Sequence, residues 1–367
     1  MLPYIERHLM GRTALPLHSG LEAVNMEEKI MRLHYLGVDL AKNVFQLHGE
    51  DAEGNIVYRK RLGRARFLND IGRLAGCQIG IEACTGAFYW QREFEALGHS
   101  VRIIAPQYLK PFARHQKNVQ NDAAAICTAL RQPNMRFVPP KSLGQQDIQA
   151  LHRVRQRLVN RRTALVSQTR GLLLDRGLAF GLSITRARRV VLRLLTMERD
   201  RLGDLFTSLP EQLFEMLCEL DRRVVWLDRE INRVFRSNEA CQRIAKIRGV
   251  GPKTATAIVA AIVDGAEFNN GRHLAAWLGL VPKQHSSGNR QMLQGISKRG
   301  DRHLRALLVH GARAVLRTAP KHHDAVSQWA IGLQERRGAA KAIVAIANKN
   351  ARIIFAMLRQ NTEFGTA

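Results

Sequence analysis

The sequence predicts an α/β domain followed by a mainly helical region, and three observations support this fold class. Extended runs and helical segments alternate over residues 34–144, which is typical of an α/β domain. Apolar residues recur with helical spacing over 145–240, which predicts a long helical, coiled-coil linker. Short helical patterns separated by glycines fill 241–360, which predicts a third, mainly helical domain. We expect residues 1–33 to be a disordered extension.

The N-terminal region opens with a predicted hairpin. Its first extended run is HYLGVDLAKNVFQLHG (34–49), which the turn sequence DAEGN joins to a second run, NIVYRKRL. A helix over 65–75, an apolar run over 78–84, a helix opening near Gly86, an extended run over 101–106 and a further helix follow. A hairpin followed by strand–helix alternation predicts a mixed sheet.

The charge of the chain favours a polyanionic partner. It has 57 Lys and Arg against 31 Asp and Glu, giving a net charge of +26. Such an excess favours nucleic acid, because each neutralised phosphate releases bound counterions. No apolar run is long enough to span a membrane, and charges interrupt every candidate signal segment. The five cysteines lack CxxC spacing, which favours reduced thiols and a cytoplasmic location.

The middle region is helical and basic. Residues 151–200 hold twelve arginines and three acids, so we expect Arg153, Arg157 and Arg161 to contact nucleic acid. Pro210 is expected to mark a helix start or a kink. The apolar repeats fit either an antiparallel hairpin of two long helices or a dimerising coiled coil. The repeats are Leu151, Leu158, Leu165 and Leu172, and then Leu213, Leu217, Leu220, Val224, Leu227, Ile231 and Val234.

Three carboxylates stand among apolar neighbours in the N-terminal region. Asp39 lies in an extended run, Glu82 ends the apolar run IGI, and Asp122 precedes the Ala-rich segment AAAICTAL. Asp122 alone fits an ordinary helix N-cap. Together, acids on two strands and a following helix can converge at one edge of a sheet, where they would bind a hard divalent cation such as Mg²⁺.

The C-terminal region begins with a helix-hairpin-helix pattern over 244–263. Gly249 and Gly251 allow the tight turn, and the backbone N–H groups that open the second helix, with Lys253, are candidates to hold a phosphate. A helical hairpin used only for packing is the alternative.

A serine-containing basic segment follows. Ser287, with Ser286 as the less favoured choice, is a candidate nucleophile toward a phosphodiester. Nearby cations would neutralise the phosphoryl charge. The alternative is a loop that grips phosphate without chemistry. The candidate cations are Arg290, Lys298, Arg299 and Arg302.

Several long segments in one order resemble the insertion-sequence-110 family of transposases, and specifically its insertion-sequence-1111 subgroup. They include GVDLAKNVFQLHG, IGIEACTGAFYW, IRGVGPKTATAIVAAI and LGLVPKQHSSGNRQMLQGISKRGDRHLRALLVHGARAVL. The resemblance runs from about residue 34 to residue 360. It implies an RNase H-like (RuvC-like) domain with a DEDD acidic set, a coiled-coil linker and a C-terminal domain holding a catalytic serine. It also implies a recombinase guided by a structured noncoding RNA, working on double-stranded DNA as a homodimer or homotetramer with Mg²⁺.

The motifs transfer to particular positions. Asp39 matches the first acid of the family, Glu82 the second, Asp122 the last, and Ser287 the serine. The third acid of the family's motif is Val119 here, and the glutamate of its A-E-A-I motif is Ala124. The acidic set is therefore reduced to three carboxylates. We expect a transposase with a phosphoserine intermediate. Its alternatives are a nuclease that cuts branched DNA with water, and an impaired copy that only binds nucleic acid.

Overall fold

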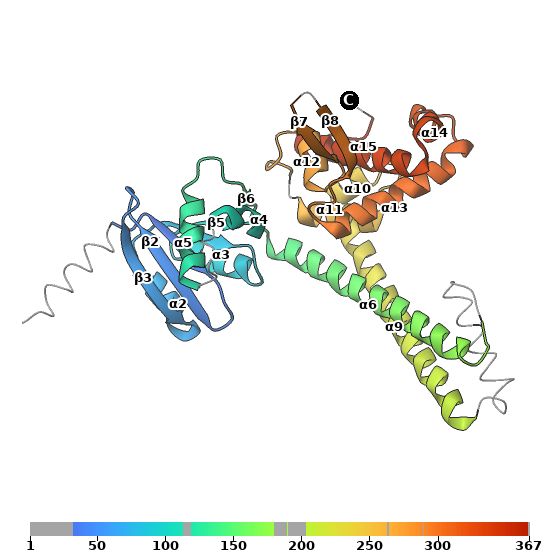
Figure 1. Ribbon diagram of the computed structural model, residues 1–367, viewed down its shortest axis with the longest axis horizontal. Helices are drawn as coiled ribbons and strands as arrows, with labels where there is room; N and C mark the ends of the chain where they lie inside the picture. The colour runs from blue at the N-terminus through green and yellow to red at the C-terminus, as the bar shows by residue number, and fades with distance from the viewer. Residues whose placement is uncertain are drawn as a thin grey trace, which may run out of the picture. The chain divides into compact units, whose positions relative to one another are not determined.

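The computed structural model describes residues 32–112, 119–179, 189, 203–262, 264–288 and 290–365. Residues 1–31 of the expected N-terminal extension lie outside the described residues. The chain divides into two compact units, Met1–Pro140 and Lys141–Ala367 (Figure 1). The predicted middle region therefore shares a unit with the C-terminal region. Among the described helices, none is long and apolar enough to cross a membrane.

The N-terminal unit is built on a six-stranded mixed sheet, which confirms the predicted α/β class. The strand order is β3-β2-β1-β4-β5-β6, with β1, β4 and β5 parallel and the other neighbours antiparallel. The elements are β1 (Tyr35–Asp39), β2 (Val44–Glu50), β3 (Ile56–Gly63), α2 (Arg64–Ile71), β4 (Gln78–Glu82), α3 (Ala87–Ala96), β5 (Ser100–Ile104), α4 (Pro106–Leu109), a 3₁₀ turn (Lys110–Phe112), α5 (Val119–Leu130) and β6 (Phe137–Val138).

The run over 34–49 forms two strands rather than the single one that we predicted. The chain turns between β1 and β2 at residues 40–43, and β2 then pairs antiparallel with both β1 and β3. The turn has no glycine or proline, and Asn43 is its one residue that strongly favours a turn.

Helices cover the two faces of this sheet. On one face, Phe67 of α2 stacks on Phe45, with ring centroids 3.9 Å apart, and Trp90 and Phe94 of α3 pack edge-on around them. On the other face, Ile126 and Leu130 of α5 are buried in a second cluster. Burial of these apolar side chains on both faces stabilises the sheet.

Helix α5 lies directly on the sheet because two glycines leave room for it. Gly37 of β1 and Gly80 of β4 are neighbours in the parallel register. A Cβ atom at Gly37 would overlap the carbonyl oxygen of Ala123, and one at Gly80 would lie 3.0 Å from a methyl group of Ile126. The backbone of α5 therefore approaches the sheet more closely than side chains at these two positions would allow.

The second unit begins with two long antiparallel helices, α6 (Leu143–Leu174) and α9 (Asp204–Ser237), which lie side by side (Figure 1). Ser142 caps α6 through a capping box with Gln145. Between the helices, Arg155 donates to Asp228 at 2.5 Å and Arg162 donates to Asp221 at 3.1 Å. The second arginine lies seven residues after the first, whereas its aspartate lies seven residues before the first aspartate. This opposite direction is the register of an antiparallel helix pair.

The predicted apolar repeat on α9 is confirmed as the packed face of that helix. Leu217, Val224, Leu227 and Ile231 are buried, and Leu217 meets Leu165 and Val166 of α6. The antiparallel hairpin is therefore the arrangement within one chain. Pro210 does not start the helix as expected, because α9 begins at Asp204 and continues past it.

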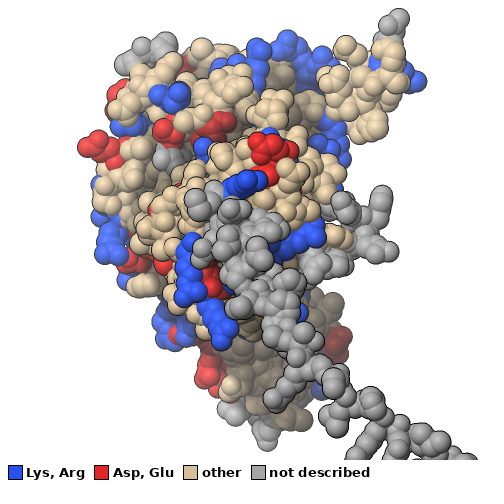
Figure 2. Space-filling model, turned by 90° about the vertical axis from the view of Figure 1, so that its left-hand side faces the viewer, with Lys and Arg blue, Asp and Glu red and all other residues tan. Residues whose placement is uncertain are grey.

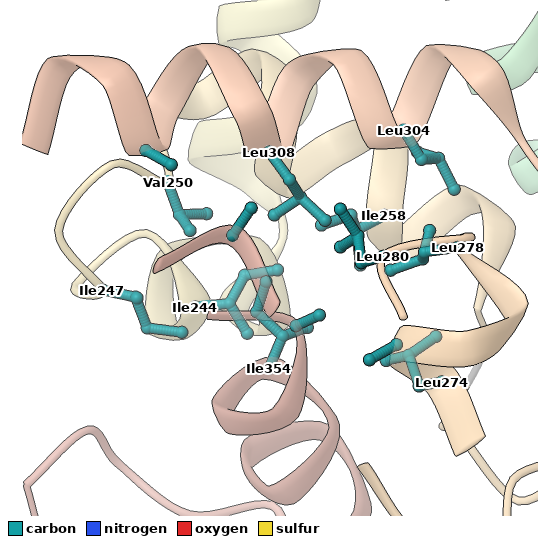
Figure 3. Packing of buried hydrophobic residues seen from close by; sticks show 14 of the residues in the cluster. Ile244, Ile247, Val250, Ile258, Leu274, Leu278, Leu280, Leu304, Leu308 and Ile354 are labelled. Carbon is teal, nitrogen blue, oxygen red and sulfur yellow. The ribbon is translucent and has the colours of Figure 1, made fainter. Parts of the chain in front are cut away.

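The rest of this unit consists of short helices around one large core. In Figure 3, Leu304 and Leu308 of α13 point toward Ile258, Leu278 and Leu280. The mainly helical class of this region is confirmed. The elements are α10 (Glu239–Ile244), α11 (Pro252–Ala261), α12 (Gly271–Trp277), β7 (Pro282–Ser287), β8 (Arg290–Ile296), α13 (Arg302–Thr318), a 3₁₀ turn (Ala319–Lys321), α14 (Ala325–Arg337) and α15 (Ala339–Gln360).

Candidate functional site

Two of the predicted acids lie at neighbouring strand ends. Asp39 is the last residue of β1 and Glu82 the last residue of β4. The parallel register pairs Val38 with Ile81, so the two carboxylates follow it side by side. Because side chains alternate along a strand, both acids project on the face that carries Gly37 and Gly80, which is the face under α5.

Asp122 joins them from the helix. It lies in the first turn of α5, directly before Ala123, whose carbonyl oxygen lies over Gly37. The N-cap alternative for Asp122 is wrong, because α5 is already helical at Val119. The structure thus places all three predicted acids on one face of the sheet, at the carboxyl ends of the parallel strands.

The described residues do not form a finished metal centre. Among them, no three His, Cys, Asp or Glu side chains converge closely enough to hold an ion. The donor chemistry nevertheless fits a hard cation, since Asp39 and Glu82 offer carboxylate oxygens from rigid strand ends. Mg²⁺ takes one or two protein carboxylates and keeps several waters. Asp39 and Glu82 therefore match the number of carboxylates that Mg²⁺ usually takes from a protein, and Asp122 lies on the helix that covers them.

The electrostatics around Cys84 also show that the two acids are close. Partial desolvation raises the pKa of the Cys84 thiol, and the charges of Glu82 and Asp39 raise it further. The carboxylates of Asp39 and Glu82 therefore both lie close enough to Cys84, which follows β4, to affect the pKa of its thiol.

The two substituted family positions lie on the same helix. Val119 is the first residue of α5, one helical turn before Ala123. Ala124 is half-buried in the second turn. Positions 119 and 122 are therefore one turn apart on the same helix.

Ser287 lies at the tip of an exposed hairpin. It is the last residue of β7 and pairs with Arg290, the first residue of β8, across a turn at Gly288. Directly paired residues project on the same face of an antiparallel ladder, so the side chains of Arg290 and Ser287 leave the hairpin on the same side. Ser286 projects on the opposite face, where its hydroxyl accepts a hydrogen bond from Gln284 at 2.9 Å.

The other predicted cations lie at the base of this hairpin. Lys298 and Arg299 follow β8, whose last residue pairs with Pro282 at the start of β7. At about 3.4 Å per residue, that end lies about 17 Å from Ser287. Of the four predicted cations, Arg290 is therefore the one paired with Ser287, while Lys298, Arg299 and Arg302 lie toward or beyond the base of the hairpin.

The base of the hairpin is held firmly. Gly300 packs against the end of α12, where a Cβ atom would overlap the carbonyl oxygen of Trp277. Arg305 donates to the carbonyls of Leu278 and Arg299, at 3.0 and 3.1 Å. Lys298 has a φ of 55°, a backbone conformation rare outside glycine. These contacts fix the position of Lys298 and Arg299 on the rigid core.

The predicted helix-hairpin-helix pattern forms two helices, α10 and α11, joined by a turn. Gly249, with a φ of 85°, faces α13, because a Cβ atom there would lie 2.8 Å from the carbonyl oxygen of Gly311. Packing explains this glycine, so its role as a phosphate contact is not supported. Gly251 is exposed at the start of α11, and Lys253 donates to Asp228 at 3.1 Å.

The three arginines predicted on α6 are exposed, unlike Arg155 and Arg162, which pair with α9. Arg153, Arg157 and Arg161 recur every four residues and follow one face of the helix. On the face that Figure 2 shows, by contrast, Lys and Arg are interspersed with Asp and Glu. Arg153, Arg157 and Arg161 thus form a basic ridge along α6.

A buried histidine in this unit was not predicted. His152 of α6 lies against Thr256 of α11, with Nε2 and Oγ1 2.9 Å apart. The Thr256 hydroxyl donates to the carbonyl of Pro252, so the His152 Nε2–H donates to Thr256. Burial lowers the pKa of His152 to about 4, and the nearby His303 adds to this effect. The His152 side chain is therefore neutral at pH 7.

This histidine makes the second unit sensitive to acid. Between pH 6.5 and about 4 the unfolded chain binds a proton at His152 that the folded chain does not, so the free energy of unfolding falls by up to about 3 kcal/mol as the pH drops. We expect His152→Gln, which keeps a donor to Thr256, to lose correspondingly less stability over this range. Denaturant unfolding at pH 7 and pH 4.5 measures the difference, and parallel losses would contradict the assignment.

Two family models match the chain. A model described as "Transposase IS116/IS110/IS902 family" matches residues 241–327. A second model, described as "Transposase" and named for the DEDD transposases of IS110, matches residues 36–176 and so spans the sheet with its three acids.

Several curated proteins are similar over nearly the whole chain. A probable family 20 transposase of Pseudomonas aeruginosa is 46% identical over 90% of this chain and 98% of its own length. The transposase for insertion sequence element IS1111A of Coxiella burnetii is 44% identical over 89% of this chain and 90% of its own. A pilin gene-inverting protein of Moraxella bovis is 24% identical over 90% of this chain and 97% of its own.

Proposed function

Because the chain belongs to the IS110/IS116/IS902 family of insertion-sequence transposases, we propose that it cuts and rejoins DNA through a covalent link to Ser287, assisted by a divalent metal ion at Asp39, Glu82 and Asp122. Transposases are enzymes that cleave and rejoin DNA, and DEDD-type domains typically use divalent ions. The observation that carries the proposal is the presence of both reactive sets in one chain: strand-end acids under α5, and an exposed serine paired with an arginine.

The Ser287 half is a transesterification. The Ser287 oxygen attacks the phosphorus, an O–P bond forms, and the bond from phosphorus to the 3′ oxygen breaks. The serine proton leaves and the departing 3′ oxygen becomes a hydroxyl, so the strand is held as a 5′-phosphoserine. A 3′-hydroxyl of another strand reverses these steps and frees Ser287. Arg290 lies where its guanidinium can neutralise the phosphoryl charge.

The acidic half belongs to the N-terminal unit, for which the matching DEDD model favours an RNase H-like fold. Mg²⁺ bound there would polarise the scissile phosphate and neutralise its charge. Asp39 and Glu82 would provide the ligands on rigid strand ends, and Asp122 would approach from α5. The depth of α5 on the sheet, which Gly37 and Gly80 permit, sets the spacing between the helix acid and the strand acids.

Trapping the covalent intermediate tests this proposal directly. The full-length protein is incubated with DNA carrying the element ends and Mg²⁺, and is then denatured and digested. We expect mass spectrometry to find a nucleotide adduct on the peptide that holds Ser286 and Ser287. DNA cleavage without an adduct would instead indicate a nuclease that uses water, with Ser287 only gripping phosphate.

A guide RNA is the partner that would choose the DNA targets. In such a system base pairing reads the sequence, while the protein reads shape and backbone through cations such as those of α6. Sequencing the RNA that co-purifies with the protein tests this. A defined species from the flank of the element supports guidance, and random cellular RNA contradicts it. A homodimer or homotetramer would hold the two DNAs together.

An impaired copy that only binds nucleic acid is the second candidate. It is favoured by Val119 and Ala124, which replace two acids of the family's motif, and by the lack of a three-ligand cluster among the described residues. This candidate predicts RNA binding without strand exchange.

Restoring the acids distinguishes the two candidates. The double change Val119→Asp with Ala124→Glu adds a carboxylate one turn from Asp122 and a second nearby. If the missing acids limit the reaction, Mg²⁺ affinity and strand exchange both rise, by about tenfold or more. Calorimetric Mg²⁺ titration and a recombination assay measure the two effects. Unchanged values would show that three carboxylates are sufficient.

A further inference from the structure

A cavity of about 640 Å³ lies between α6, α11 and the start of α13, entirely within the second unit. Its volume falls in the range of small-molecule sites, roughly 300–1,000 Å³. One wall is the ridge of Arg153, Arg157 and Arg161, and the opposite walls carry His303 and the half-buried Trp277. The cavity is distinct from the serine hairpin and from the acidic edge of the sheet.

The charge of the cavity favours a phosphate. Arginines recur at its mouth on successive turns of α6, and none of the three forms an ion pair with a residue that the structure describes. Asp301 is its single lining acid, and its carboxylate is engaged as the cap of α13, accepting from the N–H groups of His303 and Leu304 at 2.7 and 3.0 Å. The three arginines and Lys141 outnumber this single acid, so the lining carries a net positive charge.

The interior favours a planar, neutral group with hydrogen-bonding edges. His152 and His303 lie with ring centroids 5.6 Å apart, and burial lowers the pKa of both, so both rings are uncharged at pH 7. The His303 Nε2 atom is buried and has no hydrogen-bond partner among the residues that the structure describes. An unpaired buried polar atom is costly, so a group that bonds to it is favoured. Amide side chains of Gln156 and Asn160 complete the lining.

We propose that this cavity binds one unstacked nucleotide of a single-stranded segment, with the base among the histidines and Trp277 and the phosphates on the arginine ridge. Aromatic and imidazole rings stack on any base, while arginines track the backbone. A paired duplex cannot offer a base without breaking a pair. The chemistry is common to DNA and RNA, and the inference does not depend on the reaction at Ser287.

Filling the cavity tests the proposal without removing a charge. Ala164 lines the cavity but is exposed on α6, so Ala164→Trp blocks the site and leaves the packed face of the helix intact. Val154→Trp is the matched control, since Val154 is 51% exposed on α6 and is not part of the lining. Fluorescence anisotropy with labelled oligonucleotides of roughly twelve residues measures binding by the full-length protein.

We expect Ala164→Trp to weaken binding of a single-stranded oligonucleotide by about tenfold while duplex binding stays unchanged. The control variant should bind both as the unmodified protein does. The same sequence is tested as DNA and as RNA. If Ala164→Trp weakens binding of one of them more, that nucleic acid supplies the nucleotide that the cavity binds. Equal affinity of Ala164→Trp and the control for both strands would overturn the proposal.

Two further measurements separate the base from the phosphate. An abasic oligonucleotide, which keeps the sugar–phosphate chain, should bind the unmodified protein as weakly as the normal strand binds Ala164→Trp. If it binds as tightly as the normal strand, the cavity does not take a base. Arg157→Glu should weaken single-stranded binding and reduce its dependence on salt, relative to Arg229→Glu on the exposed part of α9. If Arg157→Glu and Arg229→Glu weaken binding equally, the arginine ridge is not part of the binding site.

Discussion

Replacing Ser287 with alanine is expected to abolish both the covalent adduct and strand exchange, with a loss of about 10³-fold or more. The reason is that no other group among the described hairpin residues presents a hydroxyl beside Arg290. Binding to DNA should remain, since the change removes one oxygen atom from an exposed position. A recombination assay and adduct trapping under denaturing conditions measure the two losses.

Ser286→Ala is the matched control for this prediction. Ser286 is the adjacent serine, but it projects on the opposite face of β7 and accepts a bond from Gln284. Its loss should leave adduct formation close to that of the unmodified protein. If Ser286→Ala instead removes the adduct and Ser287→Ala keeps it, the assignment of the nucleophile is reversed.

Replacing Asp39 with asparagine is expected to reduce strand cleavage on the order of a hundredfold or more, by weakening attachment of the metal ion. Asparagine keeps the size of the side chain but removes the charge beside Glu82. DNA binding and the thermal stability of the protein should change little, because Asp39 lies at a strand end and is not part of the core. Cleavage rates and Mg²⁺ titration measure the effect.

Asp70→Asn provides the control in the same unit. Asp70 lies on α2, beneath the other face of the sheet, and pairs with Lys60 at 3.3 Å. Its removal changes the net charge equally but leaves the edge under α5 untouched. If Asp39→Asn and Asp70→Asn both recombine DNA at the rate of the unmodified protein, the acidic site has no role in the reaction.

Much of the fold could be predicted because the N-terminal pattern is local. A hairpin followed by alternation specifies a mixed sheet, and the apolar stripe of α9 identifies its buried face. The turn at residues 40–43 was missed because it has neither glycine nor proline and Asn43 is a weak signal by itself. The pairing of Arg155 and Arg162 was missed for a different reason: their partners, Asp228 and Asp221, lie 73 and 59 residues away in the sequence.

The candidate site was predictable in its residue types and less so in its geometry. Asp39, Glu82 and Asp122 stand out because acids are rare among apolar neighbours. Their common face depends on Gly37 and Gly80, which look unremarkable in a strand until α5 is seen on top of them. Gly249 was assigned to phosphate because a tight turn suggests it, whereas the close approach of Gly311 is the physical reason for that glycine.

The hairpin that carries Ser287 has a consequence for when the enzyme becomes reactive. Every described side chain of β7 and β8 except Ile296 is exposed, and a two-stranded ribbon without a packed face is only marginally stable in water. Its amide protons should exchange fast in the free protein and slowly once DNA is bound. Under the proposed role of Ser287, part of the binding energy of the DNA would then be used to order the nucleophile, and the measured affinity would be weaker than the contacts alone would give. A serine ordered mainly on bound substrate would attack other DNA more slowly.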